Sequence, residues 1–103
     1  MAFNKSHLFD PADQLVSGFA RALSHPVRLD ILRILAKHGP CTVENLSLRY
    51  PLSKSTISQH LELLRKYRLI QYREEFPYIV YSLDDDAFGK LNSRLIEYCQ
   101  KIK

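Results

Sequence analysis

The chain has 103 residues, of which 46% are apolar and 25% charged, so it can bury one modest core and is not composed like a disordered protein. Its net charge of +4 is mildly basic, which favours a polyanionic partner only weakly. Because it has no run of about 18 apolar residues and no apolar signal region, we expect no membrane span, no secretion and a cytoplasmic location.

The first two predicted helices are separated by a break at residues 24–26. Asp10 can cap the first helix and Pro11 suits its opening position, so we expect this helix to run to about Leu23. The second helix should end at Gly39-Pro40, a typical helix stop. Its apolar stripe consists of Val27, Ile31, Ile34 and Leu35.

Two further helices lie close together in the sequence. Thr42 can cap a third helix over residues 43–49, and Ser53 can cap a fourth helix that runs to about Tyr67. Pro51 marks the turn between them. Two helices joined by such a short turn are typical of a helix-turn-helix unit.

The fourth helix separates its polar and apolar side chains. At about 100° per residue, Leu61 and Leu64 lie within about 40° of Ile57 and form one face. The opposite face carries short hydroxyl and amide side chains, where a surface helix usually carries lysine and glutamate. Such side chains fit the floor of a DNA major groove and can reach base edges and phosphates. The DNA contacts expected from this helix and the segment after it are Ser53, Lys54, Ser55, Thr56, Ser58, Gln59, His60, Arg65, Lys66 and Arg73.

Charge supports the same interpretation of this region. From Arg49 to Arg73 there are six Lys or Arg residues and one acid, Glu62, which is the charge pattern expected of a polyanion-binding surface. Glu62 is on the exposed face but too far along the helix to reach a base, so we do not assign it to the site. His60 lies about 60° from Ile57, at the edge of the core, where it can pack and donate to a phosphate or a backbone carbonyl.

The pattern then changes to a period of two, which predicts a β-hairpin. Ile70 and Tyr72 alternate with polar residues, and after a tip at Phe76-Pro77 the apolar residues Ile79, Tyr81 and Leu83 alternate with Val80 and Ser82.

Asp84 or Asp85 can cap a last helix. Apolar residues recur along this helix at steps of three and four: Phe88, Leu91, Leu95, Tyr98 or Cys99, and Ile102. We therefore expect a mainly α fold with a small β-hairpin, a single winged helix-turn-helix domain over residues 1–103, with residues 1–9 as a flexible arm.

Three motifs in this arrangement resemble the ArsR-type family of small bacterial transcriptional repressors. They are ALSHPVRLDIL at residues 22–32, STISQHL at residues 55–61, and Tyr81-Ser82-Leu83. The resemblance, which covers roughly residues 12–100, implies a homodimer in which the fourth helix reads the major groove of double-stranded operator DNA and the hairpin touches the flanking backbone. Because the dimer is two-fold, the operator should be an inverted repeat. The first and last helices should form the dimer interface, with Leu15, Phe19, Phe88, Leu91, Leu95, Tyr98 and Ile102.

The sequence departs from the family pattern in three places. Tyr67-Arg68-Leu69 replaces the usual glycine-containing step after the fourth helix, so either Arg68 adopts a left-handed conformation or the helix ends differently. The hairpin tip is acidic, with Glu74 and Glu75. The family's metal sensors have a Cys-x-Cys motif in the third helix or metal ligands including histidine on the last, but residues 43–49 lack cysteine and residues 84–103 lack histidine.

We therefore expect no metal site and no cofactor, and the effector stays unassigned. His38, Cys41 and Glu44 are the nearest candidate cluster and lack an obvious fourth ligand. Cys41 and Cys99 could sense redox state as a dithiol, but we favour two small buried apolar residues.

A dimeric sequence-specific regulator is the favoured function. The alternative is a winged-helix module for protein interaction that has lost specific DNA binding. No enzyme is expected, because no motif combines a nucleophile, a base and an orienting group.

Overall fold

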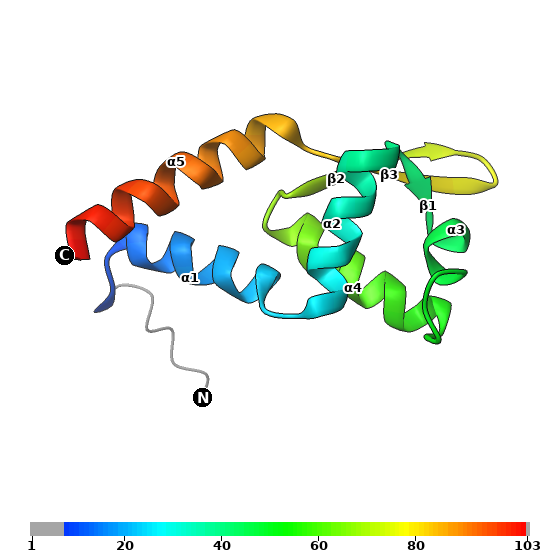
Figure 1. The fold of residues 1–103 in the computed structure, drawn as a ribbon, viewed down its shortest axis with the longest axis horizontal. Coiled ribbons are helices and arrows are strands. Elements are labelled where there is room, and N and C mark those ends of the chain that lie inside the picture. Colours follow the sequence, from blue (N-terminus) through cyan, green and yellow to red (C-terminus); the bar gives the residue numbers. More distant parts are fainter. Residues whose placement is uncertain (1–7, 103) are drawn as a thin grey trace.

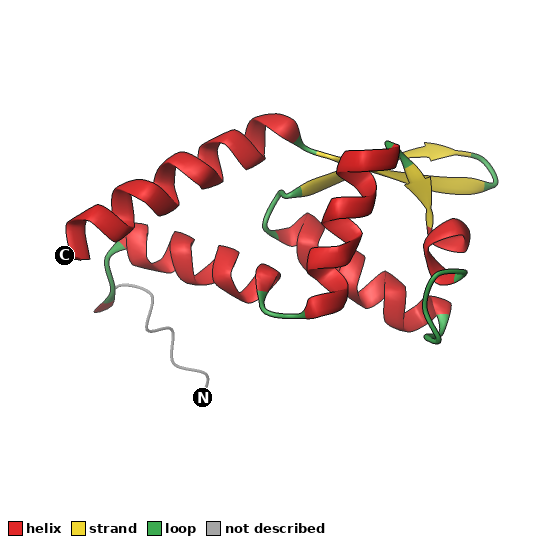
Figure 2. Ribbon diagram, in the orientation of Figure 1, coloured by secondary structure: helices red, strands yellow, loops and turns green. Residues whose placement is uncertain are grey.

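A computed structural model describes residues 8–102 of the chain. Figure 1 shows two helices that extend side by side at one end of the molecule and a compact unit of three helices and a sheet at the other, and Figure 2 shows the same view by secondary structure. The elements in chain order are α1 (Pro11–Leu23), α2 (Pro26–His38), β1 (Cys41–Thr42), α3 (Val43–Ser47), α4 (Lys54–Lys66), β2 (Ile70–Glu75), β3 (Tyr78–Leu83) and α5 (Asp85–Ile102).

Side-chain caps start the helices where the sequence predicts. Asp10 accepts a hydrogen bond of 2.7 Å from the backbone of Ala12, Thr42 one of 3.1 Å from Asn45, and Ser53 one of 3.2 Å from Thr56. Asp84, one of the two predicted caps of the last helix, accepts one of 3.0 Å from Ala87. The helix expected over residues 43–49 ends earlier, at Ser47, because the chain turns there toward Pro51.

The core lies where α2, α3 and α4 meet beneath the sheet. Its fully buried side chains come from four separate segments: Ile31, Leu46, Ile57, Leu61, Leu64, Leu69 and Ile70. Burying a side chain of this size contributes about 1.5–3 kcal/mol. The apolar face predicted for the fourth helix is thus confirmed, and its burial fixes which face of α4 points outward.

The sheet has a strand that periodicity did not predict. It is antiparallel in the order β1-β3-β2, and the two-residue strand β1 pairs Cys41 with Tyr81 and Thr42 with Val80. Val80 is accordingly buried, whereas Ile79, one of the alternating apolar residues of the predicted strand, is 42% exposed. Ile79 is exposed because β1 ends at Thr42, opposite Val80, and the part of the hairpin between Val80 and the tip extends past the core.

The exit from α4 takes the left-handed route that was one of the two alternatives. Arg68 has φ of 63°, its N–H donates to the carbonyl of Arg65 at 2.9 Å, and the N–H of Leu69 donates to the carbonyl of Leu64 at 3.1 Å. This is the Schellman arrangement, which usually has glycine at the position of Arg68. The burial of Leu64 and Leu69 on either side holds the strained residue in place.

The two long helices α1 and α5 lie side by side, with the start of α1 near the end of α5 (Figure 1). Phe19 and Leu91, two of the expected dimer-interface residues, are already buried within one chain, at 8% and 3% exposure. Leu15, Phe88 and Leu95 are only partly covered by the core. The larger exposed apolar side chains here are Ile96 and Ile102.

The expected arm, residues 1–9, lies outside the described residues apart from Leu8 and Phe9, whose side chains are exposed. Within residues 8–102, no helix combines the length and the apolar character needed to cross a membrane.

Candidate nucleic-acid interface

The outer face of α4 carries the short polar side chains that the sequence assigned to DNA. Ser55 and Gln59 are exposed, and Thr56 and Ser58 are half-buried, while the opposite face is closed by the core. Lys54 and Lys66 are exposed at the two ends of the helix. The polar face is therefore open to a partner along the whole length of α4.

Three hydroxyl groups gather at the first turn of α4. The Ser53 hydroxyl lies 3.0 Å from the Ser55 hydroxyl and 3.0 Å from that of Thr56, while it also caps the helix. Free N–H groups and the positive end of the helix dipole meet at such a terminus and favour an anion. This end of α4 suits a phosphate or an electron-rich base edge.

Arg65 is tied to two neighbours near the other end of the helix. Its guanidinium donates to both carboxylate oxygens of Glu62 and lies 5.4 Å from the centroid of the Tyr72 ring. The hydrogen bond from Arg65 lowers the pKa of Glu62, whereas the carboxylate raises the pKa of Arg65. Glu62, which was left out of the site, thus restrains one of its expected cations.

The hairpin tip contributes little free positive charge. Arg73, the expected contact on the hairpin, donates to the carboxylate of Glu75 at 2.7 Å, and both side chains are largely exposed. Phe76, at the tip, is 99% exposed. Glu74 is exposed beside this pair.

His60 is the expected site residue that faces inward. Its Nδ1 lies 3.0 Å from a guanidinium nitrogen of Arg28, and its ring centroid lies 4.5 Å from that of His25. Because arginine can only donate, Nδ1 is the acceptor and the proton of the neutral ring is on Nε2. Burial lowers the pKa of His60 below its ordinary value of 6.5, and the nearby His25 and Arg28 add to this effect.

Arg28 was missed by the sequence reasoning, although it lies in the motif at residues 22–32. Its guanidinium also donates to the carbonyls of Ala22, at 2.8 Å, and Arg21, at 3.1 Å, and to the hydroxyl of Ser24. It therefore ties the end of α1 to α4. A lone arginine in the first turn of an amphipathic helix gave no signal of this role.

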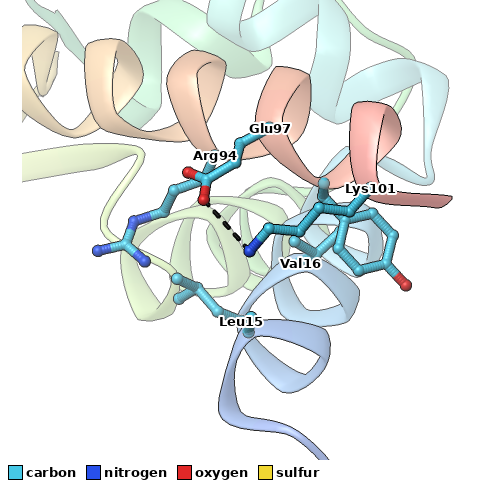
Figure 3. A pocket seen from close by; sticks show the side chains of 7 residues that line it. Leu15, Val16, Arg94, Glu97 and Lys101 are labelled. Atoms are coloured by element: carbon cyan, nitrogen blue, oxygen red, sulfur yellow. Dashed lines mark ion pairs between the residues drawn. The ribbon is translucent and has the colours of Figure 1, made fainter. Parts of the chain in front are cut away.

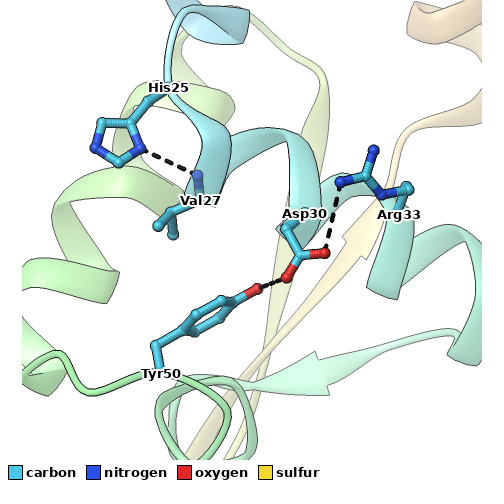
Figure 4. A network of polar contacts seen from close by, with 5 residues as sticks. All are labelled: His25, Val27, Asp30, Arg33 and Tyr50. Carbon is cyan, nitrogen blue, oxygen red and sulfur yellow. Dashed lines mark hydrogen bonds and ion pairs between the residues drawn. The ribbon is translucent and has the colours of Figure 1, made fainter.

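A second polar link was missed in the turn before α4. The hydroxyl of Tyr50 donates to Oδ2 of Asp30 at 2.5 Å, and Arg33 pairs with the other carboxylate oxygen at 3.6 Å (Figure 4). In the same view, Nδ1 of His25 accepts from the N–H of Val27 at 3.1 Å and caps α2. The turn that positions α4 is thus anchored to α2, the central helix of the core.

No metal-ligand cluster is found in the part of the chain that the structure describes, where three or more His, Cys, Asp or Glu side chains nowhere gather around one point. Cys41, in the nearest candidate cluster, is half-buried and donates to the carbonyl of Gly39 at 3.4 Å. Cys99 is exposed, so the expectation that both thiols are buried is wrong for this one.

The expected dimer residues are divided between the core and the gap between α1 and α5. Leu15 and Tyr98 line a small hollow of about 90 Å³ in this gap, together with Val16. Figure 3 shows this hollow with the ion pair of Glu97 and Lys101, 3.3 Å between Oε1 and Nζ, at its rim, while the Arg94 guanidinium stays outside that pair. Ile102 is exposed at the end of α5.

Comparisons with known proteins agree on one family. The model of the family described as "Bacterial regulatory protein, arsR family" matches residues 25–72, from the start of α2 into β2. A transcriptional repressor SmtB homolog from Synechocystis is 32% identical over 92 residues, which cover 89% of this chain and 68% of that protein. The nodulation protein NolR from Rhizobium meliloti is 34% identical over 98 residues, which cover 88% of this chain and 80% of its own.

The fold is also found among solved structures. An ArsR-like transcriptional regulator from Rhodococcus superposes with a TM-score of 0.76, covering 89% of this chain and 86% of that one, at 22% identity. At this identity the match supports the architecture alone, which is mainly helical with a small antiparallel hairpin.

Proposed function

The chain belongs to the arsR family of bacterial regulatory proteins, whose members bind operator DNA and regulate transcription rather than catalyse reactions, and we propose that it acts as a homodimeric repressor at an inverted-repeat operator. The observation that carries this proposal is the open polar face of α4, whose opposite face is buried in the core. A helix so mounted can enter a major groove without exposing apolar side chains.

We assign direct base contacts to the exposed face over the first two turns of α4. Ser55, Ser58 and Gln59 are short enough to approach base edges, and Gln59 can form two hydrogen bonds with an adenine. Ser53, Lys54 and Thr56 lie at the first turn and suit a phosphate. Arg65, Lys66 and Arg73 supply further charge, and His60 can donate to the DNA backbone only through Nε2.

Dimerisation is supported by the apolar side chains that one chain leaves uncovered at its α1–α5 end. Ile96 and Ile102 are 52% and 67% exposed, and Leu8 and Phe9 are each 59% exposed near the start of α1. Phe88, Leu95 and Tyr98 on α5 are only half-buried. Several large apolar side chains exposed on two neighbouring helices favour a surface that a partner covers. A second copy covering this end would leave both α4 helices free for DNA.

We further propose that transition metals do not regulate this protein. The residues that could hold a metal are spread over different elements, and Cys41 already donates to Gly39. In a competition titration, zinc should be lost to a weak chelator with no change in DNA affinity. Retention of one zinc per chain together with release from the operator would overturn this part of the proposal.

The proposal is tested by selection of binding sites from random double-stranded DNA with the purified full chain. We expect an imperfect inverted repeat with half-sites about 10 bp apart, or a small multiple of this distance. Sedimentation should give twice the chain mass of 12.0 kDa. A monomer would contradict the dimer, and binding without any enriched motif would favour the interaction-module alternative, with the exposed tip around Phe76 as its first candidate surface.

A further inference from the structure

A groove of about 500 Å³ lies between α1, the C-terminal end of α4 and the first turns of α5. Leu15 and Phe19 of α1, Tyr67 after α4 and Ala87 of α5 give it an apolar lining. Gly18 permits this geometry, because a Cβ at that position would lie 2.5 Å from the Tyr67 ring. The volume is that of an ordinary small-molecule site.

Four cations surround this apolar lining: Lys66, Arg68, Lys90 and Arg94. Within residues 8–102, none of the four has a carboxylate oxygen within 4.0 Å, since the ion pairs there involve Arg33, Arg65, Arg73 and Lys101. Lys66 instead places its ammonium 5.7 Å from the centroid of the Tyr67 ring. The positive charge of the groove is therefore not neutralised by close pairs.

Two acids also line the groove and limit where an anion can lie. Asp84 uses one carboxylate oxygen to cap α5 through Ala87, and Asp86 is exposed one turn before Lys90. Cations still outnumber carboxylates by two to one. The groove therefore carries a net positive charge, which favours the binding of one anionic group.

We propose that this groove binds a small amphipathic organic anion, a carboxylate or sulfonate with an apolar or aromatic body, and that the bound anion weakens operator binding. Apolar and aromatic side chains would bury the body, and the unpaired cations would hold the charged group. A DNA phosphate fits this groove less well, because it has no apolar part to contact Leu15 and Phe19. The cluster of the Ser53, Ser55 and Thr56 hydroxyls, which suits a phosphate, lies at the opposite end of α4.

The link to DNA binding rests on the function proposed above. Lys66 belongs to the groove and also to the charge that attracts DNA, so an anion bound beside it lowers the positive potential at that end of α4. Leu15 and Phe19 line the groove and also belong to the expected dimer interface, so an anion bound there acts on the packing of the two copies as well as on the charge near α4. A ligand there contacts both elements whose relative position sets the spacing of the two α4 helices.

The first experiment uses no DNA. The full chain is titrated with the fluorescent anion 1-anilinonaphthalene-8-sulfonate and, separately, with the uncharged N-phenyl-1-naphthylamine. We expect saturable binding of the anion, displacement by decanoate below its micelle concentration, and no displacement by 1-decanol. Equal affinity for the charged and uncharged probes, or no saturable binding, would overturn the site.

Two matched double variants locate the binding. Lys90→Gln with Arg94→Gln removes two cations of the groove and should lower the affinity for the anionic probe about tenfold. Arg33→Gln with Lys37→Gln removes two exposed cations of α2 and should leave it unchanged. Arg68→Gly should also weaken the probe while making the chain more stable, which separates loss of the site from loss of the fold. Equal affinity in all variants would mean adventitious apolar binding only.

The second experiment measures operator affinity with and without saturating probe. We expect the probe to weaken operator binding about fivefold or more in the parent chain and in the α2 double variant, and to have no effect in the Lys90→Gln, Arg94→Gln chain. Binding of the probe without any change in operator affinity would overturn the regulatory role. Failure to find an operator would count against the proposed function alone, since the fluorescence titration tests the groove independently.

Discussion

The guanidinium of Arg28 donates a 3.0 Å hydrogen bond to Nδ1 of His60 and so joins α2 directly to the helix that carries the candidate DNA contacts. The same guanidinium holds two carbonyls at the end of α1. Protonation of His60 would replace its acceptor at Nδ1 with a donor and place two cations face to face. This hydrogen bond between α2 and α4 therefore requires a neutral histidine.

This dependence predicts a loss of stability in mild acid. Because the pKa of His60 is lower in the folded chain than its ordinary value of 6.5, the unfolded chain binds more protons as the pH falls below that value. The contribution of His60 is complete above about pH 6.5 and is lost as the pH falls toward its lower folded pKa. Urea unfolding at fixed protein concentration, compared at about pH 7.5 and about pH 5.5, measures this loss.

The matched control for this effect is His60→Asn, whose amide oxygen can replace Nδ1 as the acceptor without titrating. The pH dependence of its unfolding free energy should be smaller than that of the parent chain. If the two chains lose the same free energy between the two pH values, His60 is not the group responsible.

Tyr50→Phe should destabilise the chain by about 1–2 kcal/mol, because it removes the hydrogen bond that anchors the turn before α4 to Asp30. Tyr78→Phe is the control, since Tyr78 is half exposed on β3 and the described residues give its hydroxyl no hydrogen bond. Urea unfolding compares the two variants. Equal stability of Tyr50→Phe and the parent chain would mean that apolar packing alone fixes the turn.

Arg68→Gly should stabilise the chain by about 1 kcal/mol, because glycine adopts a φ of 63° without the steric cost that arginine has there. Lys66→Gly, two residues earlier and within α4, should instead destabilise by about 1 kcal/mol through its low helix propensity. Thermal and urea unfolding measure both. A loss of stability in Arg68→Gly would show that the Arg68 side chain stabilises the fold by more than its backbone strain destabilises it.

Two substitutions on α4 should affect DNA binding differently. Gln59→Ala should relax the selected motif, because each lost base contact costs about 1–3 kcal/mol of binding free energy. Arg65→Ala should instead weaken binding to all DNA sequences about equally and make the affinity less dependent on salt. Binding-site selection and salt titrations distinguish these outcomes. An unchanged motif for Gln59→Ala would place the base-reading face elsewhere.

Glu62→Gln should raise DNA affinity about two- to fivefold for all sequences, because Arg65 then loses its charged partner and becomes available to a phosphate. The control is Glu97→Gln, which releases Lys101 on α5, away from α4, and should leave DNA affinity unchanged. Fluorescence anisotropy with operator and with unrelated DNA measures both. A decrease in affinity would instead assign Glu62 a direct DNA contact.

The helix starts and the inward face of α4 were determined by the sequence alone, whereas the end of α3 was not. Caps such as Asp10 and Ser53 act on backbone groups two or three residues away, so they leave a local signal. The spacing of Ile57, Leu61 and Leu64 follows directly from helix geometry. At Arg68 the sequence left two alternatives open, and the structure contains one of them, the left-handed corner.

Contacts between segments distant in the sequence were decided only by the tertiary structure. β1 has two residues, too few for any periodicity, and exists because Cys41 meets Tyr81 of β3. The roles of Arg28 and Tyr50 depend on partners 32 and 20 residues away, which no local pattern specifies. Leu91 and Ile102 share one apolar stripe, yet one is buried and the other exposed, because burial depends on which element lies opposite each turn of α5.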